Sequence, residues 1–228
     1  MENLRVFINI LFVRLGIRKL LPSQAIRSIP VVECGEELVK LSSSLLRISD
    51  KTVFPVYVRK TVLDKLISIN NEMAQHGYAL LIYEAYRSSE VQYKMWHEEF
   101  EKMKFLHQDW DDNKIKHVIS KRIAQPNGIN VGGHQTGGAI DLTICTNDGI
   151  ELDMGTKYLE FSEKTFSSSK NISNLQMENR NLLIHQMREN GFANFPAEWW
   201  HFSFGDSMWA AYLRQKNAIY GDASLLCP

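Results

Sequence analysis

The stretch GGHQTGGAIDLT, residues 132–143, decides how the chain is interpreted, because it joins a glycine-rich loop to a buried strand. The four glycines around His134 permit a tight turn and a close approach of the backbone to a bound group. Asp141 follows inside an apolar run. Burying a bare carboxylate costs too much free energy, so Asp141 must be paired, hydrogen-bonded or bound to a metal. The stretch by itself leaves a metal site and a salt-bridged aspartate as open alternatives.

A second stretch, EWWH at residues 198–201, places two tryptophans between a glutamate and a histidine. Adjacent indoles bring a large apolar area and exclude water from a site. An aromatic core strand explains the tryptophans but not the polar residues on either side. Catalytic zinc sites use three ligands of His or carboxylate type and leave a fourth position for water. His134, Asp141 and His201 form such a set, which leaves Glu198 free to act as a base.

Arg87 follows Tyr86 at the end of the apolar run 78–83. An arginine there can hold a substrate carboxylate or stabilise oxyanion charge in a transition state. A structural salt bridge to Glu84 or Glu90 explains it equally well. Arg87 is therefore a candidate catalytic residue with a structural alternative.

Composition and charge indicate a globular protein and argue against several classes of partner and site. The 228 residues suit one domain with some additional helices. Hydrophobic residues make up 44% and charged residues 23%, which is ordinary for a globular protein. Lys+Arg and Asp+Glu both number 26, and the absence of a basic excess argues against a nucleic-acid partner. The three cysteines form no CxxC pair, so neither a thiolate zinc site nor a disulfide framework is expected.

The N-terminus carries an apolar run at residues 6–13 that Asn9 interrupts and Arg14 ends. The run is too short to span a bilayer, and no small-residue cleavage site follows it. We therefore expect an amphipathic N-terminal helix, no membrane span and a cytoplasmic protein, with secretion or a periplasmic location less favoured.

Hydrophobic periodicity and turn signals predict a mixture of helices and strands. Helices are expected at 3–20, 35–46, 61–75, from Ser88 or Ser89 past Phe100, and 181–190. Strands are expected at 56–58, 78–83, 138–144 and 150–152, with two more between 192 and 204, and loops at 107–117 and 163–177. No regular βαβ alternation is present. We predict an α+β fold with a small, mostly antiparallel sheet flanked by helices; residues 1–50 form an N-terminal helical extension and residues 51–228 a zinc peptidase domain.

Residues 55–205 resemble the zinc D-Ala-D-Ala dipeptidases and carboxypeptidases, the family that includes the vancomycin-resistance dipeptidase. The resemblance is carried by YEAYR at 83–87, HQTGGAIDL at 134–142, LDMGT at 152–156 and EWWH at 198–201. Each motif is weak by itself, but this order and spacing are highly specific. LDMGT and the double tryptophan favour the dipeptidase branch.

The resemblance implies one zinc ion per chain, held by His134, Asp141 and His201. It implies that Glu198 takes a proton from zinc-bound water and delivers it to the leaving amine, and that Arg87 stabilises the oxyanion. Zinc lowers the pKa of its water toward about 7, and a positioned acid/base contributes about 10²–10⁴-fold to the rate. The implied function is hydrolysis of small peptides, D-Ala-D-Ala-type dipeptides above all, in cell-wall metabolism.

The chain departs from the family pattern at three positions. Gly132 stands where the dipeptidases carry a serine, and Leu159 stands where they carry an aspartate that binds the substrate's free amine. Glu84 replaces the usual aspartate of the motif around Arg87, which is a mild change. The hydrolytic residues are thus complete, whereas the amine-binding ones are not.

Four residues are candidates for substrate binding: Asp153, Glu160, Tyr86 and Trp200. Either Asp153 or Glu160 takes over the amine, or the substrate is not plain D-Ala-D-Ala. The sequence leaves the oligomeric state open.

Two other functions remain as alternatives. One is a D,D-carboxypeptidase or endopeptidase that acts on longer peptidoglycan stems. The other is a non-catalytic zinc-binding module with a site like that of the hedgehog signalling domain. Glu198 and Arg87 favour catalysis, since a binding module needs no base beside zinc.

Overall fold

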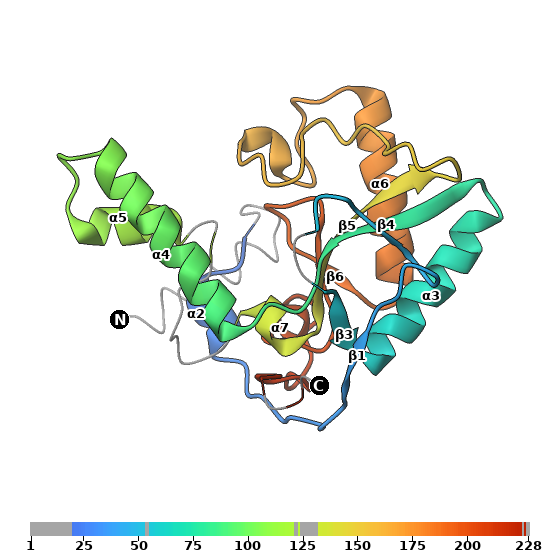
Figure 1. Ribbon diagram of the computed structural model, residues 1–228, viewed down its shortest axis with the longest axis horizontal. Coiled ribbons are helices and arrows are strands. Elements are labelled where there is room, and N and C mark those ends of the chain that lie inside the picture. The colour runs from blue at the N-terminus through green and yellow to red at the C-terminus, as the bar shows by residue number, and fades with distance from the viewer. Residues whose placement is uncertain (1–19, 53–54, 121–122, 124–131, 225, 227–228) are drawn as a thin grey trace.

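The computed structural model describes residues 20–52, 55–120, 123, 132–224 and 226 (Figure 1). The expected helix over residues 3–20 lies almost entirely outside the described residues. A five-stranded sheet forms the centre, in the order β2 (Arg47–Ile48), β4 (Tyr78–Glu84), β5 (Ala139–Thr146), β7 (His201–Ser203) and β6 (Ala193–Asn194). Only β2 and β4 pair in parallel; the other pairs are antiparallel. The predicted α+β fold with a small, mostly antiparallel sheet is confirmed.

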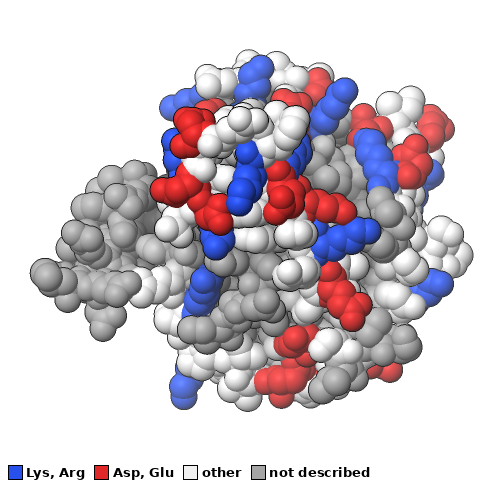
Figure 2. Space-filling model, turned by 60° about the vertical axis from the view of Figure 1, so that its left-hand side comes forward, with Lys and Arg blue, Asp and Glu red and all other residues white. Residues whose placement is uncertain are grey.

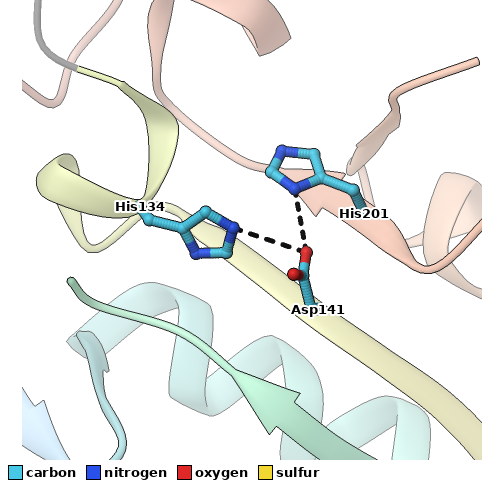
Figure 3. Close-up of side chains that lie close together, drawn as sticks. All are labelled: His134, Asp141 and His201. Atoms are coloured by element: carbon cyan, nitrogen blue, oxygen red, sulfur yellow. Dashed lines mark hydrogen bonds and ion pairs between the residues drawn. The ribbon is translucent and has the colours of Figure 1, made fainter. Parts of the chain in front are cut away.

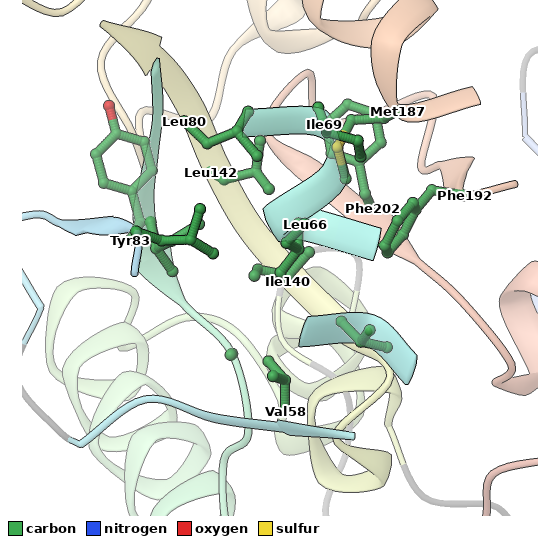
Figure 4. Close-up of a cluster of buried hydrophobic side chains, with 14 of the residues drawn as sticks. Val58, Leu66, Ile69, Leu80, Tyr83, Ile140, Leu142, Met187, Phe192 and Phe202 are labelled. Carbon is green, nitrogen blue, oxygen red and sulfur yellow. The ribbon is translucent and has the colours of Figure 1, made fainter. Parts of the chain in front are cut away.

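The main core lies between this sheet and two helices, α3 (Lys60–Ala74) and α6 (Asn174–Glu189). The apolar residues of α3 recur with the helical period, so they form one face, and Leu66 and Ile69 are completely buried. Figure 4 shows how the core side chains converge from the helices, the strands and the segment after α6. They include Leu66, Ile69, Leu80, Ile140, Leu142, Met187, Phe192 and Phe202.

Helices α4 (Ser89–Leu106) and α5 (Asp112–Ile119) form a hairpin that projects away from the sheet, at the left of Figure 1. Ser88 begins α4 as predicted, because its side chain accepts a hydrogen bond from the Val91 amide at 3.2 Å. The loop predicted over residues 107–117 is present only at 107–111, and the prediction is wrong from Asp112 onward. Ile115 and Ile119, one helical turn apart, are buried against α4 and make the polar segment helical.

The described part of the N-terminal segment contains one short helix, α2 (Ser23–Arg27), which contacts α7 (Ser207–Tyr212). The helix predicted for residues 35–46 is wrong. The segment contains β1 (Leu38–Lys40), which pairs antiparallel with β3 (Tyr57–Arg59), because pairing with a neighbouring strand outweighs local helix propensity. Since β2 also joins the central sheet, residues 38–48 pack as part of the same fold; the boundary at residue 50 stays a prediction.

Three predictions for the C-terminal half differ from the structure. Helix α6 begins at Asn174 rather than 181, because Ser173 and Gln176 form a capping box. The expected strand at 150–152 is reduced to a single bridge between Cys145 and Glu151, and a 3-10 turn, η2 (Glu163–Thr165), interrupts the expected loop. The two closing strands, β6 and β7, are confirmed.

Acidic and basic side chains alternate over the described part of the face in Figure 2, as the balanced composition leads one to expect. Among the described residues, no helix is both long enough and apolar enough to cross a membrane.

Candidate active site

Three side chains with metal-binding atoms converge at one end of the sheet (Figure 3). His134 lies in a short 3-10 helix, η1 (Gly133–Thr136), that leads into β5; Asp141 lies in β5, and His201 begins β7. Asp141 and His201 are direct partners in the β5–β7 pairing, so their side chains share one face. The ligand atoms of all three residues lie within 4.8 Å of one another.

The spacing of these atoms suits zinc. Two ligands that each bind a tetrahedral zinc ion at its usual bond length lie about 3.3 Å apart. His134 Nε2 is 3.4 Å from Asp141 Oδ1, and His201 Nδ1 is 2.8 Å from the same oxygen, a hydrogen-bond distance. Two imidazoles and one carboxylate form the donor set of a catalytic zinc site. The residues present therefore fit the metal.

The backbone determines which nitrogen of His134 faces the site. Its Nδ1 lies 2.6 Å from the carbonyl oxygen of Ala85, which can only accept, so Nδ1 carries the proton. Nε2 is then the nitrogen that faces Asp141, and it offers a lone pair to a metal once it has lost its own proton. The Arg87 amide donates to the His134 carbonyl at 3.1 Å, which ties η1 to the end of β4.

The glycine-rich loop is needed for close packing, as the sequence suggested. A Cβ atom on Gly133 would lie 2.5 Å from Asp206 Oδ2 and 3.0 Å from the Ala139 Cβ atom. Gly137 ends η1 with a φ of 71°, a left-handed conformation that glycine adopts without strain. These glycines let η1 turn sharply into β5 and bring His134 over Asp141.

The charges of Asp141 and His134 shift each other's pKa in the direction that keeps both groups ionised. Burial would raise the pKa of Asp141, but the charge of His134 and hydrogen bonds from both histidines hold it well below its usual range. Burial would lower the pKa of His134, yet the Asp141 carboxylate beside it raises that pKa above its ordinary value. Asp141 is therefore an anion near neutral pH, which is the form that binds a metal.

Glu198 lies in the turn between β6 and β7, three residues before His201. The side-chain amide of Asn194 holds this turn, since its Nδ2 donates to the carbonyl oxygens of Glu198 and His201 at 3.2 and 3.0 Å. Burial raises the pKa of Glu198 to about 7, although His201 and Arg87 act in the opposite direction. A carboxyl group of that pKa can both accept and release a proton near neutrality.

Arg87 makes the salt bridge that was the structural alternative, and it also lines the pocket of the metal ligands. Its Nε and Nη2 each donate to an oxygen of Glu84 at 2.6 Å, and its Nη1 donates to Gln92 Oε1 at 2.8 Å. This bidentate pair fixes the plane of the guanidinium group. Arg87 is thus held rigidly beside His134 and Asp141.

A single pocket of about 370 Å³ contains the three candidate metal ligands together with Glu198 and Arg87. The structure therefore brings together every residue predicted to bind the metal or act in catalysis. The pocket wall also includes Ser23, Ile26 and Arg27 from α2, Met95 from α4, and Leu159, Phe161 and Phe195. The contribution of α2 carried no recognisable signal in the sequence.

Asp153 and Glu160 lie in a different pocket of about 390 Å³. The two oxygens of Asp153 accept hydrogen bonds from the Gly155 amide and the Gln176 side chain, both at 2.8 Å. Glu160 accepts from the Lys157 amide at 3.2 Å. Their roles in amine binding stay predictions. Two neighbours of Glu160, Leu159 and Phe161, do reach the site pocket. Leu159 has a φ of 61° and is 47% exposed.

Neither of the two aromatic candidates for substrate binding is among the residues that line the pocket of the metal ligands. Tyr86 lines a smaller neighbouring pocket. Trp200 is completely buried and packs edge to face against Tyr158, with 5.6 Å between the ring centroids. Tyr158 itself was missed: its hydroxyl lies 3.0 Å from Asp141 Oδ2, an atom of a candidate metal ligand. Nothing in the sequence marked Tyr158 beyond its place just after LDMGT.

Comparisons of the chain with known proteins show its family. A family model described as D-ala-D-ala dipeptidase matches residues 52–219. The D-alanyl-D-alanine dipeptidase of Synechocystis is 26% identical over 230 residues, covering 86% of this chain and 93% of that protein. The Escherichia coli protein of the same name is 33% identical over 144 residues, 62% of either chain. A solved structure of VanYB in complex with D-Alanine-D-Alanine covers 78% of this chain and 84% of its own, with a TM-score of 0.47 and 14% identity.

Proposed function

Since the chain belongs to the D-Ala-D-Ala dipeptidase family of peptidases, it is a zinc-dependent hydrolase, and we propose that its substrates are D-Ala-D-Ala-type dipeptides. The observation that carries the proposal is the shared pocket of the three metal-binding side chains, Glu198 and Arg87. A metal-binding module would have no use for a glutamate and an arginine aimed into the same space.

Zinc bound by His134, Asp141 and His201 would lower the pKa of a water molecule and polarise the scissile carbonyl. In the proposed reaction, the oxygen of the attacking water bonds to the carbonyl carbon while Glu198 accepts a proton from that water. Glu198 then gives this proton to the amide nitrogen as the C–N bond breaks. The products are a free amine and a carboxylate. The pKa of about 7 suits a group that must act first as a base and then as an acid.

Arg87 stabilises the negative charge that develops on the carbonyl oxygen. An arginine has more N–H donors than the contacts to Glu84 and Gln92 use, so N–H groups remain for a substrate oxygen. Because those contacts already hold the guanidinium group in place, little reorganisation is needed when the charge develops.

A longer, N-capped peptide is the alternative substrate. A pocket of about 470 Å³ adjoins the site and shares Ile123, Leu159 and Phe161 with it. Apolar side chains at this junction favour an uncharged group over a free amine. The length of the substrate therefore has to be tested directly.

The test is hydrolysis of D-Ala-D-Ala, L-Ala-L-Ala and N-acetyl-D-Ala-D-Ala by the purified zinc-loaded protein. We expect Glu198→Ala to retain zinc and to lose about 10²–10⁴-fold in kcat. Glu189→Ala, at an exposed position on α6, is the matched control and should behave as the parent protein does. If Glu198→Ala keeps both zinc and full activity, the catalytic proposal is wrong. Preference for the acetylated peptide would assign the longer class of substrate.

A cytoplasmic location is also part of the proposal, supported by the interrupted apolar run at residues 6–13. Cell fractionation of a C-terminally tagged chain tests it, and recovery outside the cytoplasm would refute it.

A further inference from the structure

Tyr158 places its hydroxyl group between two carboxylates. Its Oη lies 3.0 Å from Asp141 Oδ2 and 3.2 Å from Glu84 Oε2. Glu84 and Asp141 are direct partners across β4 and β5, next to an irregularity in the register. Two carboxylates placed in this way repel each other unless another group bridges them.

The phenol can bridge them because it keeps its proton. A phenol stays protonated near neutral pH, and its single proton lies within reach of Asp141 Oδ2 and Glu84 Oε2, so the hydroxyl donates to this pair of carboxylates. Arg87 neutralises Glu84 from the other side through its bidentate salt bridge. A continuous chain of contacts therefore runs from Asp141 through Tyr158 and Glu84 to Arg87.

The two oxygens of Asp141 have different surroundings. Oδ1 contacts both histidines, whereas Oδ2 accepts the hydrogen bond from Tyr158. Rotation of the carboxylate would break the contact at Oδ2. The hydroxyl therefore holds Asp141 in the orientation that offers Oδ1 to a metal shared with the histidines.

Tyr158 is itself held firmly. Its ring stacks on Tyr83 with 4.3 Å between centroids and 15° between planes, and the buried Trp200 packs against its edge. The preceding loop is anchored where Trp199 Nε1 donates to Thr156 Oγ1 at 2.8 Å. The hydroxyl thus has little freedom to move away from Asp141.

We propose that Tyr158 is a positioning residue, whose hydroxyl orients Asp141 for zinc and links this ligand through Glu84 to Arg87. The proposal rests on the metal site described above. It assigns to a residue outside the ligand set a part in zinc affinity and a part in the placement of the arginine.

The test is zinc affinity, measured by competition with a chelator on the purified protein. Tyr158→Phe should bind zinc about 10–100-fold more weakly, the usual effect of removing a hydrogen-bond partner of a ligand. Tyr83→Phe is the matched control, because its ring stacks on Tyr158 while its hydroxyl donates to Glu151 at 2.6 Å. Its zinc affinity should stay within about threefold of the parent protein's, since Glu151 is not a metal ligand.

4-Fluorophenylalanine in place of Tyr158 separates the hydrogen bond from packing, because fluorine fills the space of the hydroxyl but donates no proton. It should weaken zinc binding as Tyr158→Phe does, and it provides the measurement if Tyr158→Phe does not fold. Folding of each variant is followed by thermal denaturation of the zinc-free protein.

Zinc affinity within about threefold of the parent value in both folded Tyr158 variants would overturn the inference. Failure of the parent protein to bind one zinc ion would instead overturn the metal site itself. A second readout is cleavage of D-Ala-D-Ala at saturating zinc: displacement of Arg87 should lower kcat in the Tyr158 variants and leave Tyr83→Phe unchanged.

Discussion

Replacement of Arg59 by methionine should destabilise the whole fold. Arg59 is completely buried, and both Nη atoms lie 3.0 Å from the Glu33 carboxylate. Its Nε donates to the Thr136 carbonyl at 2.7 Å, and its Nη2 donates to the Gly221 carbonyl at 3.4 Å. One side chain therefore ties the N-terminal segment, the loop that carries His134 and the C-terminal tail together.

The expected loss in the free energy of unfolding follows from the Glu33 carboxylate, which the substitution leaves without its partner. Removal of one partner of a buried ion pair costs about 3–5 kcal/mol. The Glu33 side chain is 34% exposed and is hydrated when its partner is lost, so the low end, about 3 kcal/mol, is expected for Arg59→Met. In a protein of this size each kcal/mol lowers Tm by about 2–4 °C, which predicts a fall of about 6–12 °C.

Urea denaturation of the zinc-free protein measures the free energy of unfolding directly. The adjacent Lys60→Ala removes an exposed salt bridge to Asp64 and is the matched control, expected to leave stability nearly unchanged. A cost below about 1 kcal/mol for Arg59→Met would refute the reasoning, since an average point mutation that breaks no buried ion pair costs about as much.

The same ion pair predicts a dependence on pH. Burial would raise the pKa of Glu33, but hydrogen bonds from the Gly221 and Gly35 amides and from Arg59 lower it below its ordinary value. A carboxyl group whose pKa is lower in the folded state stabilises the fold above its unfolded pKa and loses this contribution as pH falls. The stability difference between the parent protein and Arg59→Met should therefore shrink in acid; an unchanged difference would contradict the ion-pair account.

Three further predictions concern the site and its surroundings. Gly133→Ala should cost about 1–3 kcal/mol by overpacking against Asp206 and should weaken zinc binding, as calorimetry and chelator competition will show; unchanged affinity would mean that η1 adjusts freely. Leu159→Asp should raise kcat/KM for free D-Ala-D-Ala relative to the acetylated peptide, because a carboxylate on the pocket wall attracts an amine, and an unchanged ratio would exclude this wall from amine binding. Asp111→Ala should destabilise α5 by about 1 kcal/mol through loss of its cap, detectable by amide hydrogen exchange; equal exchange rates at Ile115 would contradict this.

The elements that the sequence predicted correctly are those in which local pattern and tertiary packing agree. The apolar period of α3 and the buried run of β4 each specify one structure, and both were found with small errors at their ends. The predictions were wrong where contacts with residues far away in the sequence determine the secondary structure. Residues 38–40 are extended because they pair with β3, and residues 112–119 are helical because Ile115 and Ile119 pack on α4.

For the site, the sequence by itself determined the chemistry, whereas the tertiary structure decided the geometry. His134, Asp141, His201, Glu198 and Arg87 could be singled out because buried polar residues beside glycines and tryptophans need a reason to be there. Their identity could not reveal that Asp141 uses one oxygen toward the histidines and the other toward a tyrosine. That division depends on the register of β4, β5 and β7 and on the stacking of aromatic rings, which arise only when distant segments pack together.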